Sequence, residues 1–185
     1  MKKKTIIGII GEQAGGKGAV SDIIIKKFGG SRLTTSNILR RTLDSLHIKF
    51  SRENLITLAL SLKKGLGDPV LMEAMLKDIE KIDSDLVIVD GIRMHGDTDP
   101  FIREYGDDFH LIYVTANQKL RYERSKGRGE KSGESEASFE EFASKEEMAT
   151  EKSISEIGKT ADFIIENNEG YKELTEKVMK IMNKI

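Results

Sequence analysis

The chain has 185 residues, with 38% hydrophobic and 33% charged side chains, as in an ordinary soluble globular domain. Its 30 basic and 31 acidic side chains nearly balance, which argues against a dedicated nucleic-acid-binding protein. The absence of cysteine excludes disulfides, thiolate metal sites and thiol nucleophiles, and no apolar run approaches the roughly 20 residues that cross a bilayer. Gly11, Glu12 and Gln13 interrupt the first apolar stretch and no small-residue cleavage site follows, so we expect a cytoplasmic protein that binds neither membranes nor nucleic acid.

Short apolar segments alternate with segments of helical periodicity along the chain. Apolar runs predict strands at 5–10, 86–89, 111–114 and 163–165, and residues 31–34 have room only for a short strand. Apolar residues at helical spacing predict helices at about 17–28, 38–46, 55–62, 69–79, 117–124, 139–157 and 174–182. Asp68 is the expected N-cap of the fourth of these, with Pro69 at its first position. Buried strands that alternate with helices indicate an α/β fold with a parallel sheet covered on both faces, in a single domain spanning 1–185.

The turn between the first strand and the first helix, residues 11–18, has the sequence GEQAGGKG. A polyphosphate needs converging backbone N–H donors, glycines that allow close approach, a helix N-terminus and one cation, and this turn offers all four. It fits the pattern G-x-x-x-x-G-K, in which Lys17 reaches the β- and γ-phosphates, although Gly18 replaces the usual Ser or Thr. The dinucleotide pattern G-x-G-x-x-G fails, because residue 21 is Ser. We therefore predict a P-loop whose nucleotide contacts are Gly11, Ala14, Gly15, Gly16, Lys17, Gly18 and Ala19.

With this turn, the chain resembles the nucleoside monophosphate kinases, and adenylate kinase in particular, which also carry Gly directly after the P-loop lysine. Residues 35–40 (TSNILR) look like the family's T-G-D-x-L-R stretch, and residues 90–93 (DGIR) look like its D-G-F-P-R segment. Residues 124–128 (RSKGR) have the R-x-x-G-R spacing found where the family's lid begins. The run 161–170 (ADFIIENNEG) instead resembles dephospho-CoA kinase and its uncharacterised relatives. The resemblance implies a five-stranded parallel sheet in the P-loop kinase arrangement, with a helical acceptor-binding insertion at 35–82 and a lid at 126–150.

Phosphoryl transfer asks a protein mainly to position two phosphates and to neutralise charge. The resemblance implies that Lys17 holds the donor ATP, and that Asp90, at the carboxyl end of a strand, binds Mg²⁺ through water. Arg124 and Arg128 share one face of a helix, which fits either contacts to the donor nucleotide or a solvated basic face. The residues that the resemblance assigns to catalysis are Lys17, Arg93, Arg124 and Arg128.

Thr35, Arg40 and Arg93 are implied to bind the acceptor, because guanidinium groups match phosphate oxygens in a bidentate way. A phosphate acceptor is already ionised near neutral pH and needs only cations, whereas the ribose hydroxyl of dephospho-CoA benefits from a carboxylate that takes its proton. Residues 34–37 contain no carboxylate, which favours a nucleoside monophosphate, and the family favours AMP.

Two departures from the family pattern leave other functions open. Ala19 stands where adenylate kinase usually has Thr, so the Mg²⁺ ion would rest on phosphate oxygens, water and Asp90. Residues 132–159 contain no arginine that a lid could bring to the phosphates. Dephospho-CoA kinase is the second enzymatic reading, and an ATP-binding sensor that transfers nothing is the non-enzymatic one. We take a monomer as the default oligomeric state.

Overall fold

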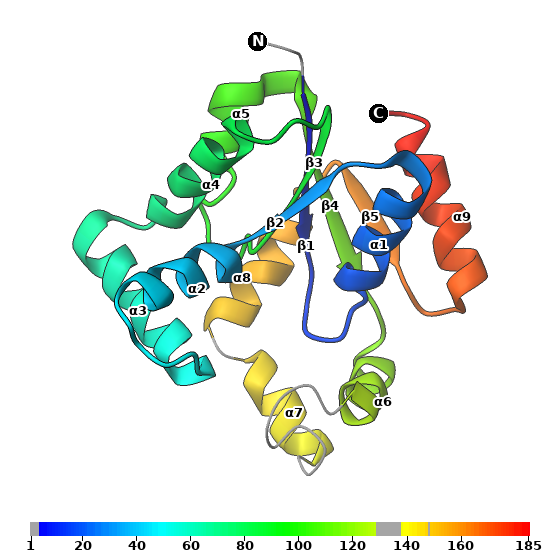
Figure 1. Ribbon diagram of the computed structural model, residues 1–185. Helices are drawn as coiled ribbons and strands as arrows, with labels where there is room; N and C mark the ends of the chain where they lie inside the picture. Colours follow the sequence, from blue (N-terminus) through cyan, green and yellow to red (C-terminus); the bar gives the residue numbers. More distant parts are fainter. Residues whose placement is uncertain (1–3, 129–137, 148) are drawn as a thin grey trace. The chain divides into compact units, whose positions relative to one another are not determined.

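The computed structural model describes residues 4–128, 138–147 and 149–185 (Figure 1). The strands in these ranges are β1 (Thr5–Ile10), β2 (Ser31–Thr34), β3 (Leu86–Asp90), β4 (Phe109–Thr115) and β5 (Phe163–Glu166). The helices are α1 (Lys17–Phe28), α2 (Thr35–Ser45), α3 (Arg52–Leu66), α4 (Val70–Glu80), α5 (Asp99–Tyr105), α6 (Gln118–Arg128), α7 (Phe139–Glu146), α8 (Ala149–Gly158) and α9 (Tyr171–Met182). A short 3-10 helix, η1 (Gly106–Asp108), connects α5 to β4.

The five strands form one parallel sheet in the order β2-β3-β1-β4-β5, flanked by helices. Strand register places Thr34 beside Asp90, and Thr115 beside Glu166, at the carboxyl ends of their strands. β1 is buried from Ile6 onwards, as is usual for a central strand that is covered on both faces. The sheet confirms the predicted α/β fold, including the short strand at 31–34.

Contacts divide the chain into two compact units, Met1–Gly8 with Gly30–Phe109 and Ile9–Gly29 with His110–Ile185. In the first unit, α2, α3 and α4 pack against one another, and α4 also packs against α5. Phe101 is fully buried, and its ring stacks on that of Phe109 with the centroids 5.6 Å apart. The segment 35–82 is largely helical, as the sequence predicts.

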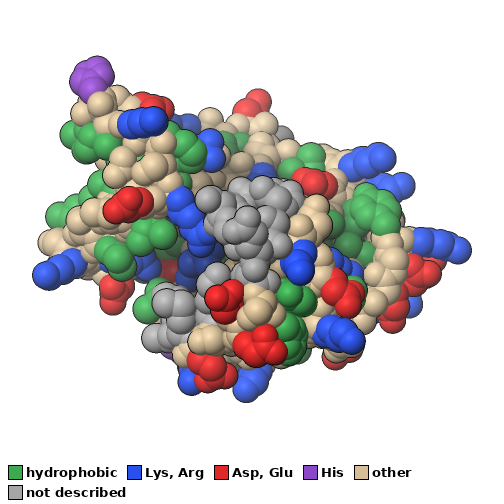
Figure 2. All heavy atoms as spheres, turned by 90° about the horizontal axis from the view of Figure 1, so that it is seen from below, with side chains coloured by type: hydrophobic (Ala, Val, Ile, Leu, Met, Phe, Trp, Pro, Cys, Tyr) green, Lys and Arg blue, Asp and Glu red, His purple; other side chains and the backbone are tan. Residues whose placement is uncertain are grey.

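Helix α3 differs from its neighbours because none of its residues is buried. Hydrophobic side chains lie at the surface of this unit (Figure 2, left), and those on and just before α3 are Leu46, Ile48, Phe50, Ile56, Leu60 and Leu66. The helix is therefore held against α2 and α4 only through half-buried contacts.

In the second unit, α1 packs against α9, and α9 also packs against β5. α6 packs against α7, where the Tyr122 ring meets the rings of Phe139 and Phe142 at centroid distances of 5.4 and 5.7 Å. The Glu-rich stretch predicted as one helical segment to about 157 instead forms two helices, α7 and α8, which pack against each other.

Two predicted helix features are wrong in detail. α4 begins at Val70, because Pro69 is its N-cap and no side chain, that of Asp68 included, makes a capping hydrogen bond. The Pro69 carbonyl accepts hydrogen bonds from the N–H groups of Met72 and Glu73 at 2.8 and 2.9 Å, so the helical turn starts after the proline. The short helix α5 is absent from the sequence prediction.

None of the described helices combines the length and the hydropathy of a membrane span.

Candidate functional site

The turn that links Ile10 to α1 belongs entirely to the second unit. Its backbone is left-handed at Ala14 and at Gly16, with φ of 58° and 110°. Gly16 is the N-cap of α1, and this helix has neither a side-chain cap nor an acidic residue in its first turn. Because N–H groups at a helix N-terminus carry partial positive charge, an end without a side-chain cap attracts anions. The turn therefore has the backbone features of a phosphate-binding loop.

Close contacts require three of the glycines in this turn. A Cβ atom on Gly11 would lie 2.0 Å from the Val114 carbonyl oxygen, and one on Gly15 would lie 2.8 Å from the same atom. A Cβ atom on Gly16 would lie 2.2 Å from Nδ2 of Asn167. Gly18 differs, because a Cβ there would meet no atom of the described chain within 4 Å. Packing thus fixes the first three glycines, whereas Gly18 faces open space.

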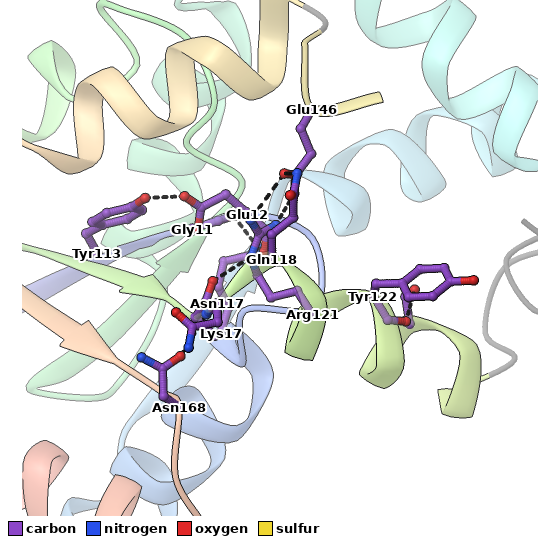
Figure 3. Close-up of polar contacts among 12 residues, drawn as sticks. Gly11, Glu12, Lys17, Tyr113, Asn117, Gln118, Arg121, Tyr122, Glu146 and Asn168 are labelled. Carbon is purple, nitrogen blue, oxygen red and sulfur yellow. Dashed lines mark hydrogen bonds and ion pairs between the residues drawn. The ribbon is translucent and has the colours of Figure 1, made fainter. Parts of the chain in front are cut away.

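Lys17, the first residue of α1, folds its side chain back over the turn (Figure 3). Its Nζ donates hydrogen bonds to the carbonyl oxygens of Gly11, at 2.5 Å, and Glu12, at 3.0 Å. The ammonium charge is therefore held at the turn by two backbone carbonyls, beside the N-terminus of α1.

Glu12 lies in the same turn, and its side chain is directed toward Tyr113 of β4 (Figure 3). The Tyr113 hydroxyl donates a hydrogen bond to Oε1 of Glu12, and only 9% of the Glu12 surface is exposed. The other carboxylate oxygen, Oε2, is buried without a hydrogen-bond partner in the described chain. Burial, reinforced by the hydrogen bond to Glu12, raises the pKa of the Tyr113 hydroxyl above its ordinary value. This pair anchors the turn to the neighbouring strand.

Asn167, which directly follows β5, packs against the glycine-rich turn at residues 11–18. Its side-chain Nδ2 donates a hydrogen bond to the Gly15 carbonyl at 2.9 Å, and only 7% of its surface is exposed. Its backbone N–H donates to the Thr115 carbonyl at 2.7 Å. The guanidinium of Arg124 donates to the Asn167 carbonyl at 2.9 Å. The structure therefore joins Arg124 to the P-loop through Asn167.

Arg121 is positioned differently from Arg124. Arg121 is buried, donates from Nε to the Ala116 carbonyl at 2.8 Å, and forms an ion pair with Glu146 of α7 (Figure 3). It therefore ties α6 to α7. Arg128 is the last residue of α6. Of the predicted lid at 126–150, residues 129–137 and 148 lie outside the described residues, and most of the remainder belongs to α6 and α7.

Asp90 and Thr35 belong to the first unit, at the carboxyl ends of β3 and β2. The Asp90 carboxylate forms an ion pair with Arg32 of β2. Thr35 packs against the turn that follows β3, because a Cβ on Gly91 would lie 2.5 Å from its Oγ1. The structure thus brings Thr35 to the 91–93 turn and gives the predicted metal-binding aspartate a cationic partner.

Arg93 lies in a turn that a buried carboxylate holds in place. Oδ2 of Asp97 accepts hydrogen bonds from the N–H groups of Arg93 and Met94 at 2.9 and 3.0 Å, and Oδ1 pairs with Lys63 of α3 at 3.2 Å. Asp97 is 1% exposed, whereas Arg93 itself is exposed. The turn is therefore fixed while the Arg93 side chain reaches the surface.

Arg40, on α2, is also exposed, and its guanidinium lies 4.2 Å from the centroid of the Phe50 ring. Such a cation–π contact orients the arginine without neutralising its charge. Arg40 and Arg93 both belong to the first unit, and both present their side chains at its surface.

Sequence reasoning missed the partners that hold these residues. No motif in the sequence assigns a role to Arg32, to Asp97 or to the Glu12–Tyr113 pair. Their roles became visible only from contacts between distant segments. The one available signal was the run 161–170, whose resemblance to dephospho-CoA kinase includes Asn167.

No protein-family model matches the chain. It is similar to a UPF0200/UPF0201 protein of Archaeoglobus fulgidus, at 25% identity over 182 residues that cover 97% of this chain and 55% of that protein. It is also similar to a UPF0200 protein of Saccharolobus islandicus, at 26% identity over 182 residues that cover 97% of this chain and 93% of that protein. The chain thus spans about half the length of the Archaeoglobus relative.

Solved structures share the fold of this chain. TT1252 from Thermus thermophilus aligns with a TM-score of 0.67 at 19% identity, over 99% of this chain and 98% of that one. Shikimate kinase from Bacteroides thetaiotaomicron aligns with a TM-score of 0.65 at 13% identity, over 97% of each chain. A gluconokinase from Sinorhizobium meliloti aligns with a TM-score of 0.57 at 10% identity, over 99% of this chain and 93% of that one. At such identities the likeness shows the fold alone: this chain has the fold of P-loop kinases and is similar in sequence to UPF0200 proteins.

Proposed function

We propose that the protein is an ATP-dependent kinase that transfers the γ-phosphoryl group of Mg·ATP to a nucleoside monophosphate such as AMP. One observation carries the donor half of this proposal: α1 starts at a left-handed Gly16 with no side-chain cap, and Lys17 places its ammonium beside that N-terminus. Backbone N–H donors and one cation at a helix start are what a triphosphate needs. The fold, which is shared with kinases of small molecules, supports the same reading.

The acceptor half of the proposal rests on the first unit. Arg93 extends from a turn that Asp97 fixes, and Arg40 stacks on Phe50. Two exposed guanidinium groups suit a dianionic phosphate, which needs cations rather than a general base. This charge supports a monophosphate as the acceptor.

The donor set fits a Mg²⁺ ion that arrives with the nucleotide rather than one held by a dedicated protein site. Gly18 and Ala19 offer no hydroxyl, and Asp90 offers one carboxylate, which it shares with Arg32. The described residues contain no group of three or more side chains that could ligate a metal. When bound with the nucleotide, the ion would neutralise phosphate charge.

One observation favours a second candidate, an ATP-binding sensor without transfer activity. The ion pair with Arg32 compensates the charge of Asp90, the carboxylate that the kinase reading assigns to the metal. A protein that only binds nucleotide does not need this carboxylate free. Dephospho-CoA remains the alternative acceptor for the kinase reading.

The test is ADP production from Mg·ATP across a panel of acceptors: AMP, CMP, UMP, GMP, the deoxynucleotides and dephospho-CoA. Lys17→Ala should lower kcat/KM by roughly 100-fold or more, since a lost charge-assisted phosphate contact costs about 3 kcal/mol. Lys26→Ala is the matched control, because Lys26 lies on the same helix in its last turn and is exposed. Full activity of Lys17→Ala would refute the donor site, turnover of dephospho-CoA alone would correct the acceptor, and ATP binding without any turnover would favour the sensor.

A further inference from the structure

The hydrogen bond from Asn167 to the Gly15 carbonyl joins residues that lie 152 positions apart and fixes the orientation of a backbone peptide in the turn. The Gly15 carbonyl and the Gly16 N–H belong to one planar trans peptide unit, in which they point in opposite directions. A partner that fixes the carbonyl therefore also fixes the direction of the N–H. Because Gly16 is the N-cap of α1, its N–H is among the donors that an anion at this helix end would meet.

We infer that Asn167 is a positioning residue for the phosphate cradle, by which we mean the turn at residues 11–18, and that it acts through the Gly15–Gly16 peptide. This inference rests on the proposed nucleotide site. Two hydrogen bonds of its backbone and the burial of its side chain leave Asn167 little freedom. Its backbone N–H is bonded to Thr115, its carbonyl accepts from Arg124, and its side chain is buried. A Cβ on Gly16 would overlap Nδ2, so the amide group lies directly against the peptide that it orients.

The same residue also joins Arg124 to the cradle. The Arg124 guanidinium is bonded to the carbonyl of Asn167, whose side chain is bonded to Gly15. An arginine held in this way has its charge placed relative to the turn by a single intermediate residue. Asn167 therefore positions two groups for the triphosphate, a backbone N–H and a guanidinium.

The probe is inorganic tripolyphosphate, measured by calorimetry alongside ATP, because it reports on the phosphate cradle without base or ribose. Asn167→Ala removes the donor to Gly15 and should weaken tripolyphosphate binding about tenfold, equivalent to one hydrogen bond to the anion, because the Gly16 N–H is no longer held in a fixed direction. Asn54→Ala is the matched control, since Nδ2 of Asn54 also donates to a backbone carbonyl, that of Lys49 at 2.7 Å, in the first unit. Its tripolyphosphate affinity should equal that of the wild type.

A second variant, Asn167→Asp, keeps the shape of the side chain. Its ionised carboxylate only accepts hydrogen bonds, whereas the protonated acid can donate one to Gly15. Its affinity deficit relative to the wild type should therefore be largest near pH 8 and shrink toward pH 5, while the deficit of Asn167→Ala stays constant. The amide NMR resonance of Gly16 should shift when tripolyphosphate binds to the wild type, and it should shift less in Asn167→Ala.

Three outcomes would overturn the inference. Folded Asn167→Ala and Asn167→Asp that bind tripolyphosphate as the wild type does would show that the contact does not position the cradle. If neither variant folds, Asn167 is a structural residue only. If the wild type binds neither tripolyphosphate nor ATP, the nucleotide site itself is wrong, and the positioning role is refuted with it; this result is distinct from the first because it appears before any substitution is made.

Discussion

Replacing Gly11 by Ala tests whether the P-loop packs against β4 as described. The new Cβ would lie 2.0 Å from the Val114 carbonyl oxygen, more than 1 Å inside an ordinary contact of about 3.5 Å. The oxygen belongs to the backbone of a buried strand, so no side-chain rotation can relieve the overlap. We expect a cost near the upper end of overpacking, about 3 kcal/mol. For a chain of 185 residues this lowers the Tm by roughly 6–12 °C.

Gly18→Ala is the matched control in the same turn. A Cβ there meets no described atom within 4 Å, and Gly18 is a helical residue of α1, so alanine should stabilise the fold by about 0.5–1 kcal/mol. Gly15→Ala, with its Cβ 2.8 Å from the same oxygen, should fall between the two. Thermal unfolding followed by circular dichroism in phosphate-free buffer measures all three, because a bound anion would raise the Tm. A Tm for Gly11→Ala equal to that of Gly18→Ala would refute the packing argument.

Two further predictions concern side chains that hold the site. Because burial raises the folded-state pKa of Tyr113 above about 10, its unfolded value, the neutral phenol adds stability below pH 10 that is lost as the pH rises through the folded-state pKa. The wild type should therefore lose more stability between pH 9 and 12 than Tyr113→Phe does, and parallel alkaline denaturation curves would contradict this. Asp97→Asn removes the charge that pairs with Lys63, so it should lower the free energy of unfolding in urea by about 2–4 kcal/mol and raise the KM for the acceptor. Asp22→Asn, at an exposed position, should change neither quantity. An unchanged urea midpoint for Asp97→Asn would mean that this carboxylate does not hold the turn.

The parts of the fold that could be predicted are those with a signal in a short stretch of sequence. The run 5–10 is apolar and β-branched, and its burial follows directly from that composition. The sequence also locates the P-loop, because its glycines and Lys17 are contiguous. Helix α5 was not predicted because it has only seven residues and two buried side chains, which is too short a segment to show a helical period.

The contacts that complete the candidate site could not be predicted in the same way. Arg32 reaches Asp90 across 58 positions of sequence, and this pairing depends on the register of β2 against β3. The guanidinium of Arg40 lies over the ring of Phe50, and the residue pattern of α2, to which Arg40 belongs, does not predict this contact. Side chains that meet through strand register or helix packing carry no spacing rule in the sequence, so their roles had to come from the structure.

The separation between Gly15 and Asn167 bears on the order in which the protein is made. Synthesis proceeds from the N-terminus, so the glycine-rich turn leaves the ribosome long before the asparagine that orients its peptide. A nascent chain therefore carries the complete P-loop sequence but lacks one of the contacts that define its shape. Under the proposed function, competence to hold a triphosphate would then appear only together with β5, and nucleotide binding would report that Asn167 has reached the turn.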